Sequence, residues 1–404
     1  MDQAKESAKQ IKDHRQIGQE LDLYSFHDVA PGAVFWHPKG WHIFLTLQKY
    51  IREMLEKEGY TEISSPVMVK NELFKKSGHW EHYKEHMFNF DVEAESYSLK
   101  PMNCPESTLI YSSKTRSYQD LPIRYSDFGV LHRNELSGTL GGLFRVRQMS
   151  QDDAHLYVRP DQIQQEIKNL LKLIVNFYKM LNFKTEFYLS TRPDKAMGDP
   201  KLWIEAEKDL EEALKDTKVK YGIKEKDGAF YGPKIDIHIK DSQNRDWQLA
   251  TIQLDFQIPE RMELKYIDKD GLAKQPIIIH RAILGSLERF IGILTEHYQG
   301  AFPLWLSPVQ VIIMPITDEQ EEFAKKLTED LKKEGIRAEL DNRPERLQAK
   351  IRDGSLQKVP YLGIIGNREI EKNSISVRMR NGKDDVLKIS DFLQRLKQEI
   401  DKKI

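Results

Sequence analysis

Hydrophobic side chains recur every three or four positions over residues 41–58, and this spacing predicts an amphipathic helix. Gly59 follows the segment directly, as expected for a glycine that ends a helix. The same periodicity predicts a long helix over residues 161–181. Residues 247–256 are predicted to form a strand, and residues 277–296 a strand end that continues into an apolar helix.

The segments between these elements predict further strands. Residues 61–69 suit a strand broken by Pro66, which places this proline at an edge, a bulge or an interface. Residues 121–158 predict a strand, a glycine-bearing loop at 134–142 and a second strand. Residues 188–240 predict strands interrupted by one charged helix at about 205–215.

The C-terminal part of the chain alternates in a regular way. It follows a linker bracketed by Pro303 and Pro308. Predicted strands are 309–314, 337–340, 361–365 and 375–378, and predicted helices are 319–334, 347–358 and 389–400. This alternation favours a small, separately folded α/β domain. With a polar helix predicted at the N-terminus, we expect three parts: residues 1–20, 21–304 and 305–404.

Composition narrows the class of protein. Charged residues make up 31% and hydrophobic residues 39% of the chain, so we expect a soluble globular protein. The formal net charge of -1 gives no overall basic field, although a local basic patch remains compatible with nucleic-acid binding. The single cysteine excludes an internal disulfide framework and favours a reducing, cytoplasmic location. No apolar run is long enough to span a bilayer and no signal peptide is recognisable, so no membrane partner is expected.

Three side chains suggest a metal centre. Cys104, His155 and His280 would supply one thiolate and two imidazoles, which is a catalytic zinc arrangement with the fourth position open. Their spacing is not that of a zinc finger, so the alternative is a buried cysteine with two ordinary core histidines. Asp153 lies two positions before His155 on a predicted strand, hence on the same face. It would orient a metal ligand or bind a polar group of the substrate.

A stretch rich in arginine suggests a phosphate clamp. Arg133 and Glu135 are expected to point the same way from a strand, and Arg145 and Arg147 would complete a cationic wall across the loop. Arg289, in the apolar helix, would emerge beside them. Each of these features has an ordinary structural alternative. Arg133 and Glu135 would form a surface ion pair, Arg145 and Arg147 would belong to a solvated face, and Arg289 would be one surface arginine of a plain core helix. The chain contains no GxxxxGK[ST] motif, so any nucleotide would be held by arginines and not by a P-loop.

These motifs occur together in one family. The chain resembles the threonyl-tRNA synthetases, which are class II aminoacyl-tRNA synthetases, from about Asp13 to Ile400. The matching motifs are Asp13-His14-Arg15, Trp36-His37, Gly78-His79-Trp80, Met102-Asn103-Cys104-Pro105, His132-Arg133-Asn134-Glu135, Gln151-Asp152-Asp153-Ala154-His155, Ala229-Phe230-Tyr231-Gly232-Pro233-Lys234, Gln253-Leu254-Asp255-Phe256 and His280-Arg281-Ala282-Ile283-Leu284-Gly285-Ser286.

The resemblance implies a fold and a reaction. The fold would be α+β, with a class II antiparallel sheet flanked by helices and then a small α/β anticodon-binding domain. The reaction would be ATP-dependent ligation of L-threonine to tRNA(Thr) through a threonyl-adenylate. One Zn²⁺ per chain would select threonine over valine, and Mg²⁺ would accompany ATP. The chain would form a homodimer, with Pro66 in its interface.

The resemblance also implies residue roles. Arg133 and Arg289 would be catalytic, and Cys104, His155 and His280 would bind the metal. The predicted ATP contacts are Arg133, Glu135, Arg145, Met149 and Arg289. The predicted threonine contacts are Met102, Gln151, Asp153, Tyr231, Lys234 and Gln253. The predicted anticodon contacts are Arg343, Glu369 and Arg378.

The sequence departs from the family pattern at several positions. Glu106-Ser107 replace the common Gly-His, Met149 stands where an aromatic residue is frequent, and Pro344 replaces an asparagine that helps to read the anticodon. Many family members remove misacylated serine with an N-terminal editing domain. The sequence begins near the helix that usually follows it, so we expect no editing in cis, with proofreading absent or left to a separate trans-editing protein.

Two other functions compete with the ligase. A synthetase-like paralogue would bind RNA or an amino acid without aminoacylation, but such proteins typically lose a metal ligand or a motif arginine, and here none is lost. A zinc hydrolase would need a general-base motif such as His-Glu-x-x-His, which the sequence lacks.

Overall fold

The computed structural model describes residues 11–403. The predicted N-terminal helix falls partly outside these residues, and its described part contains α1 (His14–Glu20). Contacts divide the described chain into two units, one of residues 11–25, 35–47 and 293–403, the other of residues 26–34 and 48–292. The divisions cut helices α2 (Pro38–Lys57) and α9 (Leu287–His297), so the predicted domain bounds stay a prediction.

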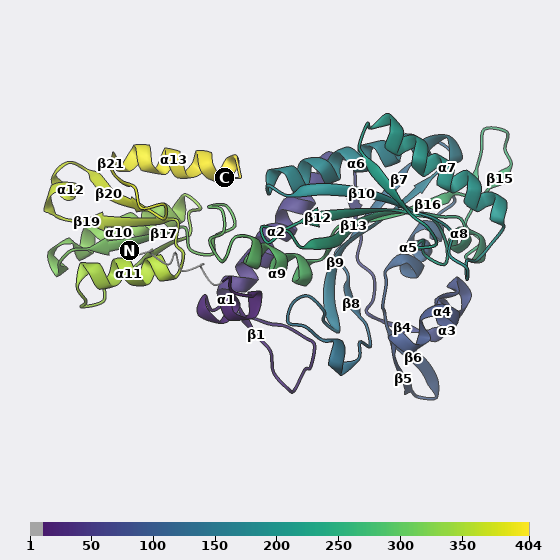
Figure 1. The fold of residues 1–404 in the computed structure, drawn as a ribbon, viewed down its shortest axis with the longest axis horizontal. Helices are drawn as coiled ribbons and strands as arrows, with labels where there is room; N and C mark the ends of the chain where they lie inside the picture. Colours follow the sequence, from purple (N-terminus) through teal and green to yellow (C-terminus); the bar gives the residue numbers. More distant parts are fainter. Residues whose placement is uncertain (1–10, 404) are drawn as a thin grey trace, which may run out of the picture. The chain divides into compact units, whose positions relative to one another are not determined.

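Nine strands of residues 48–292 form one sheet (Figure 1). Their spatial order is β11-β10-β12-β13-β16-β9-β7-β3, and β8 pairs with β9. The strands are β3 (Thr61–Glu62), β7 (Ile123–Asp127), β8 (Val130–His132), β9 (Gln148–Val158), β10 (Lys184–Ser190), β11 (Tyr221–Lys224), β12 (Lys234–Lys240), β13 (Asp246–Asp255) and β16 (Ile277–Ser286). All neighbours are antiparallel except β10 with β11 and β3 with β7. The predicted α+β class with an antiparallel sheet is confirmed.

Two helices cover one face of this sheet. Helices α6 (Ile163–Met180) and α7 (Pro200–Asp216) contact its strands and lie on the same side of it in Figure 1. Ile235, Ile237 and Ile239 of β12 are fully buried, which fits the alternation of side chains between the two faces of a strand. The other face of the sheet is therefore left for polar side chains.

Smaller elements complete this unit. Its further helices are α3 (Asn71–Ser77), α4 (His79–Tyr83), α5 (Cys104–Ser112) and α8 (Gln257–Arg261). A small sheet contains β4 (Met68–Lys70), β6 (Glu95–Leu99) and β5 (Phe88–Val92), and β14 (Tyr266–Ile267) pairs with β15 (Ala273–Lys274). Pro66 lies between β3 and β4, so the predicted break in the strand is confirmed, and the two pieces join different sheets.

The C-terminal part forms an α/β layer, as predicted. Its five strands have the order β18-β17-β19-β20-β21, and four helices flank them within the described residues. The strands are β17 (Val311–Pro315), β18 (Ala338–Leu340), β19 (Tyr361–Ile365), β20 (Ser374–Met379) and β21 (Asp384–Lys388). The helices are α10 (Glu321–Lys333), α11 (Leu347–Leu356), α12 (Asn367–Glu371) and α13 (Ile389–Asp401). The same unit contains the pair β1 (Tyr24–Ser25) and β2 (Phe35–Trp36).

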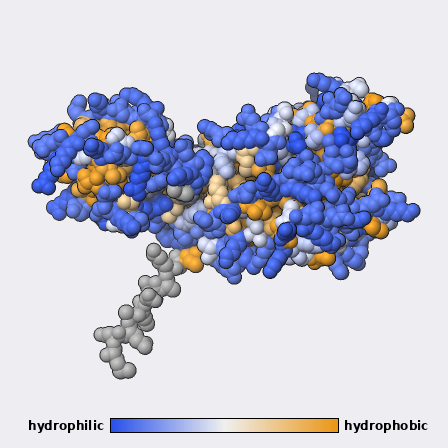
Figure 2. Space-filling view, turned by 90° about the horizontal axis from the view of Figure 1, so that it is seen from above, coloured by the Kyte–Doolittle hydropathy of each residue, from blue (hydrophilic) through white to orange (hydrophobic). Residues whose placement is uncertain are grey.

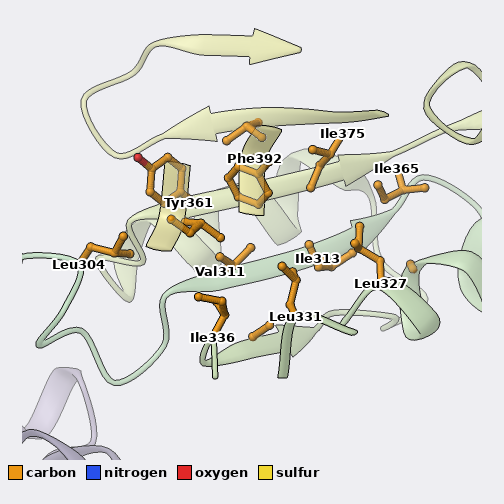
Figure 3. Close-up of a cluster of buried hydrophobic side chains, with 14 residues drawn as sticks. Leu304, Val311, Ile313, Leu327, Leu331, Ile336, Tyr361, Ile365, Ile375 and Phe392 are labelled. Atoms are coloured by element: carbon orange, nitrogen blue, oxygen red, sulfur yellow. The ribbon is translucent and has the colours of Figure 1, made fainter. Parts of the chain in front are cut away.

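The core of the C-terminal part lies between its sheet and helices (Figure 3). Val311 and Ile313 of β17 are fully buried, and Phe392 of α13 packs edge-on against Tyr361 at a centroid distance of 5.6 Å. Hydrophilic residues make up most of the face seen in Figure 2. No helix within residues 11–403 is long and apolar enough to cross a bilayer.

Candidate active site

A single row of side chains crosses the large sheet from strand to strand. His155 of β9 lies directly opposite His280 of β16, and His280 lies opposite Gln253 of β13. The row continues to Lys234 of β12. Residues opposite one another in a sheet project from the same face. Two predicted metal ligands and two predicted threonine contacts therefore share one face. The two histidines are 125 positions apart in the sequence.

Cys104 joins the two histidines at the start of α5. The potential ligand atoms of Cys104, His155 and His280 lie within 4.8 Å of one another, and all three side chains are buried. Nδ1 of His155 is a buried nitrogen without a hydrogen-bond partner among the described residues. Burial lowers the pKa of His155 well below its usual range, which keeps the imidazole in the neutral, metal-binding form. The donor set fits a zinc ion with one side open.

Asp255 fixes the ring of His280. Its Oδ2 lies 2.8 Å from Nε2 of His280, and its Oδ1 accepts hydrogen bonds from the backbone N–H groups of Gln257 and Ile258. The carboxylate is fully buried. It leaves Nδ1 of His280 as the nitrogen available to a metal, which is the usual carboxylate–histidine support of metal sites.

The sulfur of Cys104 has a histidine partner. Its Sγ lies 3.2 Å from Nε2 of His79, whose Nδ1 lies 2.9 Å from the hydroxyl of Ser77. Burial lowers the pKa of His79 to about 3, so this ring is neutral. Burial raises the pKa of the Cys104 thiol, and the carboxylates of Asp153 and Glu106 act in the same direction. A thiolate here therefore needs a compensating cation, which a bound metal ion supplies.

A pocket of about 230 Å³ opens beside the cluster, a size suited to a small molecule. The predicted site residues that line it are Met102, Cys104, Arg133, Gln151, Asp153, His155, Tyr231, Gln253 and His280. Leu249, Thr251, Arg281, Ala282 and Gly285 line it as well. Nδ2 of Asn103 donates to Oδ2 of Asp153 at 3.1 Å, which holds that carboxylate in place. The pocket therefore has a metal-binding end and a carboxylate acceptor.

A bulge in β16 shapes one wall of this pocket. The register between β9 and β16 shifts within residues 282–286. Asp152, on the opposite face of β9 from the pocket, accepts the backbone N–H groups of Ile283 at 2.9 Å and Leu284 at 2.8 Å. Gly285 has a φ of +72°, a backbone conformation that favours glycine. The bulge ends β16 and leads the chain directly into α9.

Arginines gather near the pocket. Nε of Arg289 donates to the carbonyl of Phe144 at 2.8 Å. Burial lowers the pKa of Arg289, and the positive charges of Arg133 and Arg145 lower it further. Glu135 balances one of these charges, because its Oε2 lies 2.9 Å from Nε of Arg145. The remaining cations favour a polyanionic ligand such as a triphosphate.

The predicted strand at Arg133 and Glu135 is wrong. Strand β8 ends at His132, and the N–H of Glu135 donates to the carbonyl of Arg133 at 2.8 Å. This hydrogen bond closes a three-residue turn, so the two side chains do not share a strand face. Arg147 supports the turn, because its Nε donates to the carbonyl of Glu135 at 2.9 Å. Both residues nevertheless lie near the other arginines.

Comparison with known proteins identifies this arrangement. Residues 86–298 match the family model of the tRNA synthetase class II core domain (G, H, P, S and T), and residues 310–399 match that of the anticodon binding domain. The solved structure of the RNA binding domain of threonyl-tRNA synthetase from Cryptosporidium parvum Iowa II superposes with a TM-score of 0.94 at 40% identity. That similarity covers 96% of this chain and 98% of the other. The chain belongs to the threonyl-tRNA synthetase family.

Curated threonine–tRNA ligases are similar along nearly the whole chain. The one from Clostridium kluyveri is 50% identical over 400 residues, and the one from Caldanaerobacter subterraneus subsp. tengcongensis is 49% identical over 396 residues. These similarities cover 99% and 98% of this chain, but 63% and 61% of the relatives. The chain therefore spans about three fifths of the length of these threonyl-tRNA synthetase relatives.

Some predicted contacts of the threonyl-tRNA synthetase type lie outside the pocket. Lys234 follows Gln253 in the row, and its Nζ lies 2.9 Å from the buried carboxylate of Asp236. Met149 is half-buried on β9, opposite Leu131. Neither side chain lines the pocket of the metal cluster.

The predicted anticodon contacts lie on separate elements of the C-terminal part. Arg343 follows β18 and is half exposed, with its guanidinium 2.8 Å from Asp341 and 3.1 Å from Asp353. Two carboxylates thus offset its charge.

Glu369 and Arg378 are linked through β20. Oε1 of Glu369 accepts a hydrogen bond from Ser376 at 2.8 Å, and Oε2 accepts from the N–H of Gly366 at 2.9 Å. Arg378 lies two positions after Ser376, hence on the same face of β20, and its nearest carboxylate is Asp384 at 3.9 Å. Its charge is therefore less compensated than that of Arg343.

Sequence reasoning assigned no role to three residues that support the site: His79, Asn103 and Asp255. Asp255 had a usable signal, because it lies two positions after Gln253 on a predicted strand and so on the same face. The contacts of His79 with Cys104 and of Asn103 with Asp153 join separate segments, and no local pattern reports them.

Proposed function

We propose that this chain acts as a threonine–tRNA ligase. The observation that carries the proposal is the buried Cys104–His155–His280 cluster, which shares one pocket with Asp153 and lies near the arginines. The reaction has two steps: threonine and ATP form threonyl-adenylate and pyrophosphate, and the acyl group then passes to the 3′ end of tRNA(Thr). The single cysteine agrees with a cytoplasmic setting.

In the first step, a carboxylate oxygen of threonine attacks the α-phosphorus of ATP, and the bond to pyrophosphate breaks. Arg133 and Arg289 neutralise the charge that develops on the phosphates, and Arg145 meets the outer phosphates. Glu135 accepts from the adenine amino group, and Met149 packs near the ring. Such chemistry asks the protein mainly for positioning and charge stabilisation. Mg²⁺ would accompany ATP.

Selection of the amino acid rests on the metal end of the pocket. Bound Zn²⁺ would supply a Lewis-acid position for the amino and hydroxyl groups of threonine. Asp153, held by Asn103, accepts a hydrogen bond from the same hydroxyl. Valine lacks the hydroxyl and leaves this carboxylate unpaired, and sites built for a hydroxyl reject such analogues by about 10⁴-fold or more.

Serine is the harder competitor. It keeps both polar groups and lacks only the methyl group that Met102 would contact, a difference of about 1–3 kcal/mol. Gln151, Tyr231 and Gln253 would complete the amino-acid pocket, with Lys234 beside it.

In the second step, a hydroxyl of the 3′-terminal ribose attacks the carbonyl of the adenylate, and AMP leaves. The C-terminal part would read the anticodon through Arg343, Glu369 and Arg378. Pro344 offers no amide side chain, so recognition rests on its neighbours. We propose a homodimer with Pro66 in its interface.

ATP–pyrophosphate exchange tests the proposal. The purified chain is assayed with threonine, serine and valine, before and after removal of zinc by a chelator. We expect zinc-dependent exchange with threonine, weaker exchange with serine and none with valine. If no amino acid supports exchange although zinc is bound, the chain is a non-catalytic paralogue and the proposal is wrong.

A further inference from the structure

Two lysines lie near the indole ring of Trp80, and neither has an acidic partner among the described residues. Nζ of Lys84 lies 5.1 Å from the centre of the indole ring, and Nζ of Lys75 lies 5.6 Å from it. Both are cation–π distances. Both lysines are exposed, and no carboxylate among the described residues lies within 4 Å of either ammonium group. Two positive charges therefore converge on one aromatic ring.

Two acidic residues of this region are engaged with other cations. Glu263 lies 3.3 Å from Nζ of Lys76, the residue directly after Lys75. Glu81, directly after Trp80, lies 3.3 Å from the guanidinium of Arg261. Glu72 and Glu85 also lie in this region and are exposed, but neither carboxylate lies within 4 Å of the ammonium group of Lys75 or Lys84. The lysine pair is thus accessible to an external anion.

Lys75 and Lys84 flank α4 in the sequence, and α4 contacts the candidate active site. Gly78, with a φ of +87°, ends α3 and begins α4, and this turn sets the direction of the next side chains. Helix α4 contacts the metal cluster through His79, which lies 3.2 Å from Sγ of Cys104. The same helix contacts the phosphate arginine through Tyr83, whose ring centre lies 5.8 Å from the guanidinium of Arg133. Trp80 belongs to the same short helix.

We propose that Lys75 and Lys84 bind a phosphodiester of the unpaired 3′ end of tRNA, and that Trp80 holds their ammonium groups together. The inference rests on the proposed function. Two ammonium groups repel each other, the negative face of the indole attracts both, and a phosphate between them removes the remaining repulsion. The proposed reaction brings the 3′ end of tRNA to the pocket that α4 contacts through His79 and Tyr83, and exposed lysines beside aromatic rings suit single-stranded RNA.

The test compares binding of intact tRNA(Thr) with binding of the same tRNA lacking its unpaired 3′ nucleotides, over a range of salt concentrations. The variants are K75Q, K84Q, the double variant, W80A and W80F, with zinc content as a check on folding. K76Q is the matched control, because Lys76 is paired with Glu263. We expect each of K75Q and K84Q to weaken binding of intact tRNA several-fold, and the double variant to reduce the salt slope by about 0.7, the value for one phosphate of a single strand. W80A should weaken binding similarly, and W80F should retain most of the affinity.

Three outcomes would overturn the inference. Trimmed tRNA could lose as much affinity as intact tRNA in these variants, in which case the lysines bind another part of the RNA. K76Q could match K75Q, in which case only diffuse charge matters. The lysine variants could also bind intact tRNA as well as the wild type does. Failure of the proposed function is distinguishable, because the wild type would then show no threonine-dependent ATP–pyrophosphate exchange.

Discussion

The metal pocket and the C-terminal anticodon-binding region place their predicted residues in different ways. Side chains from strands β9, β13 and β16 and from helix α5 line the pocket, and the buried cluster within it combines two of these strands with the helix. In the C-terminal region, Arg343, Glu369 and Arg378 lie on separate elements, and both arginines are exposed. A small ligand requires its contacts to converge, whereas an RNA loop can reach residues that do not touch one another.

This difference between the two regions shows where supporting residues affect function most. The pocket depends on buried partners such as Asp255 and Asn103, which fix the direction of a ligand or an acceptor. In the C-terminal region, nearby carboxylates decide instead how much charge is left for RNA. Removal of a pocket residue should therefore have large effects, and removal of an exposed arginine small ones.

The largest expected effect concerns the metal ligands. H280A should reduce zinc affinity by more than about a hundredfold. Loss of a residue that only supports a metal ligand costs about 10–100-fold in metal affinity, and loss of the ligand itself should cost more. Threonine-dependent exchange should fall with it. Metal content and exchange are measured together, and H132Q serves as the control, since His132 on β8 lies outside the cluster. Full zinc retention in H280A would contradict the assigned ligand set.

A large effect is also expected at Arg133, the arginine proposed to bind the α-phosphate. R133K keeps a positive charge but removes the planar fork, so the rate of adenylate formation should fall by about 10²–10³-fold. Single-turnover kinetics with threonine and ATP measure this rate. R159K is the control, because Arg159 pairs with Asp161 and is outside the pocket. An unchanged rate in R133K would remove Arg133 from the catalytic residues.

Support of His280 by Asp255 should be worth about 10–100-fold in zinc affinity. D255N keeps the shape of the side chain and loses the charge that favours metal binding through Nδ1. Competition with a chelator measures the affinity. D246N is a matched control, because Asp246 lies 2.6 Å from His238 on the same sheet and outside the pocket. Equal zinc affinity in both variants would show that the carboxylate has no role in metal binding.

In the C-terminal region, R378Q should weaken tRNA(Thr) binding about fivefold to tenfold and reduce the salt slope by less than one. R343Q should have a smaller effect, because Asp341 and Asp353 already offset the charge of Arg343. Binding titrations at two salt concentrations show which of the two variants loses more affinity for tRNA(Thr). The reverse order would mean that RNA displaces these carboxylates.

The last expected effect is a pair of opposite pH dependences of stability. Burial raises the pKa of Glu288 to about 8, so the folded state binds more protons than the unfolded state above about pH 4.5, and the free energy of unfolding falls as pH rises towards 8. For Glu369, burial acts to raise the pKa, but hydrogen bonds from Ser376 and Gly366 outweigh it and lower the pKa. The stabilisation that Glu369 contributes to the folded state is therefore present above about pH 4.5 and is lost as pH falls.

Denaturant unfolding across this pH range measures both effects. E288Q should flatten the decline of stability towards pH 8, and E369Q should reduce the loss of stability in acid. If both variants changed the slope of the free energy of unfolding against pH in the same direction, the opposite pKa shifts of Glu288 and Glu369 would be wrong.

The sequence predicted most elements of the fold because their periodicity is local. The helix at 161–181 is α6 and the strand at 247–256 is β13. The predicted alternation after Pro308 matches the C-terminal sheet and helices except for α12 and β21, which were not predicted. The prediction at Arg133 and Glu135 failed because a hydrogen bond between two neighbouring residues bends the chain after β8. Alternating residue types alone do not reveal such a turn.

The site was predicted in part. Residue chemistry and family resemblance named Cys104, His155 and His280, and the structure brings them together. Which partners support them depends on the pairing of β9, β13 and β16 and on the approach of α4, all of which are long-range. Lys234 is a different case, because Asp236 lies two positions later on the same strand, hence on the same face, and their contact is local.

The row that contains His155, His280 and Gln253 constrains insertions and deletions. One extra residue early in β9 would turn His155 towards the face covered by helices, without altering the chemistry of any residue. Two extra residues would restore the face but displace the ring by about 7 Å along the strand. Length variation among relatives is therefore expected to spare β9 and β16 and to accumulate in segments such as the loop at 134–142.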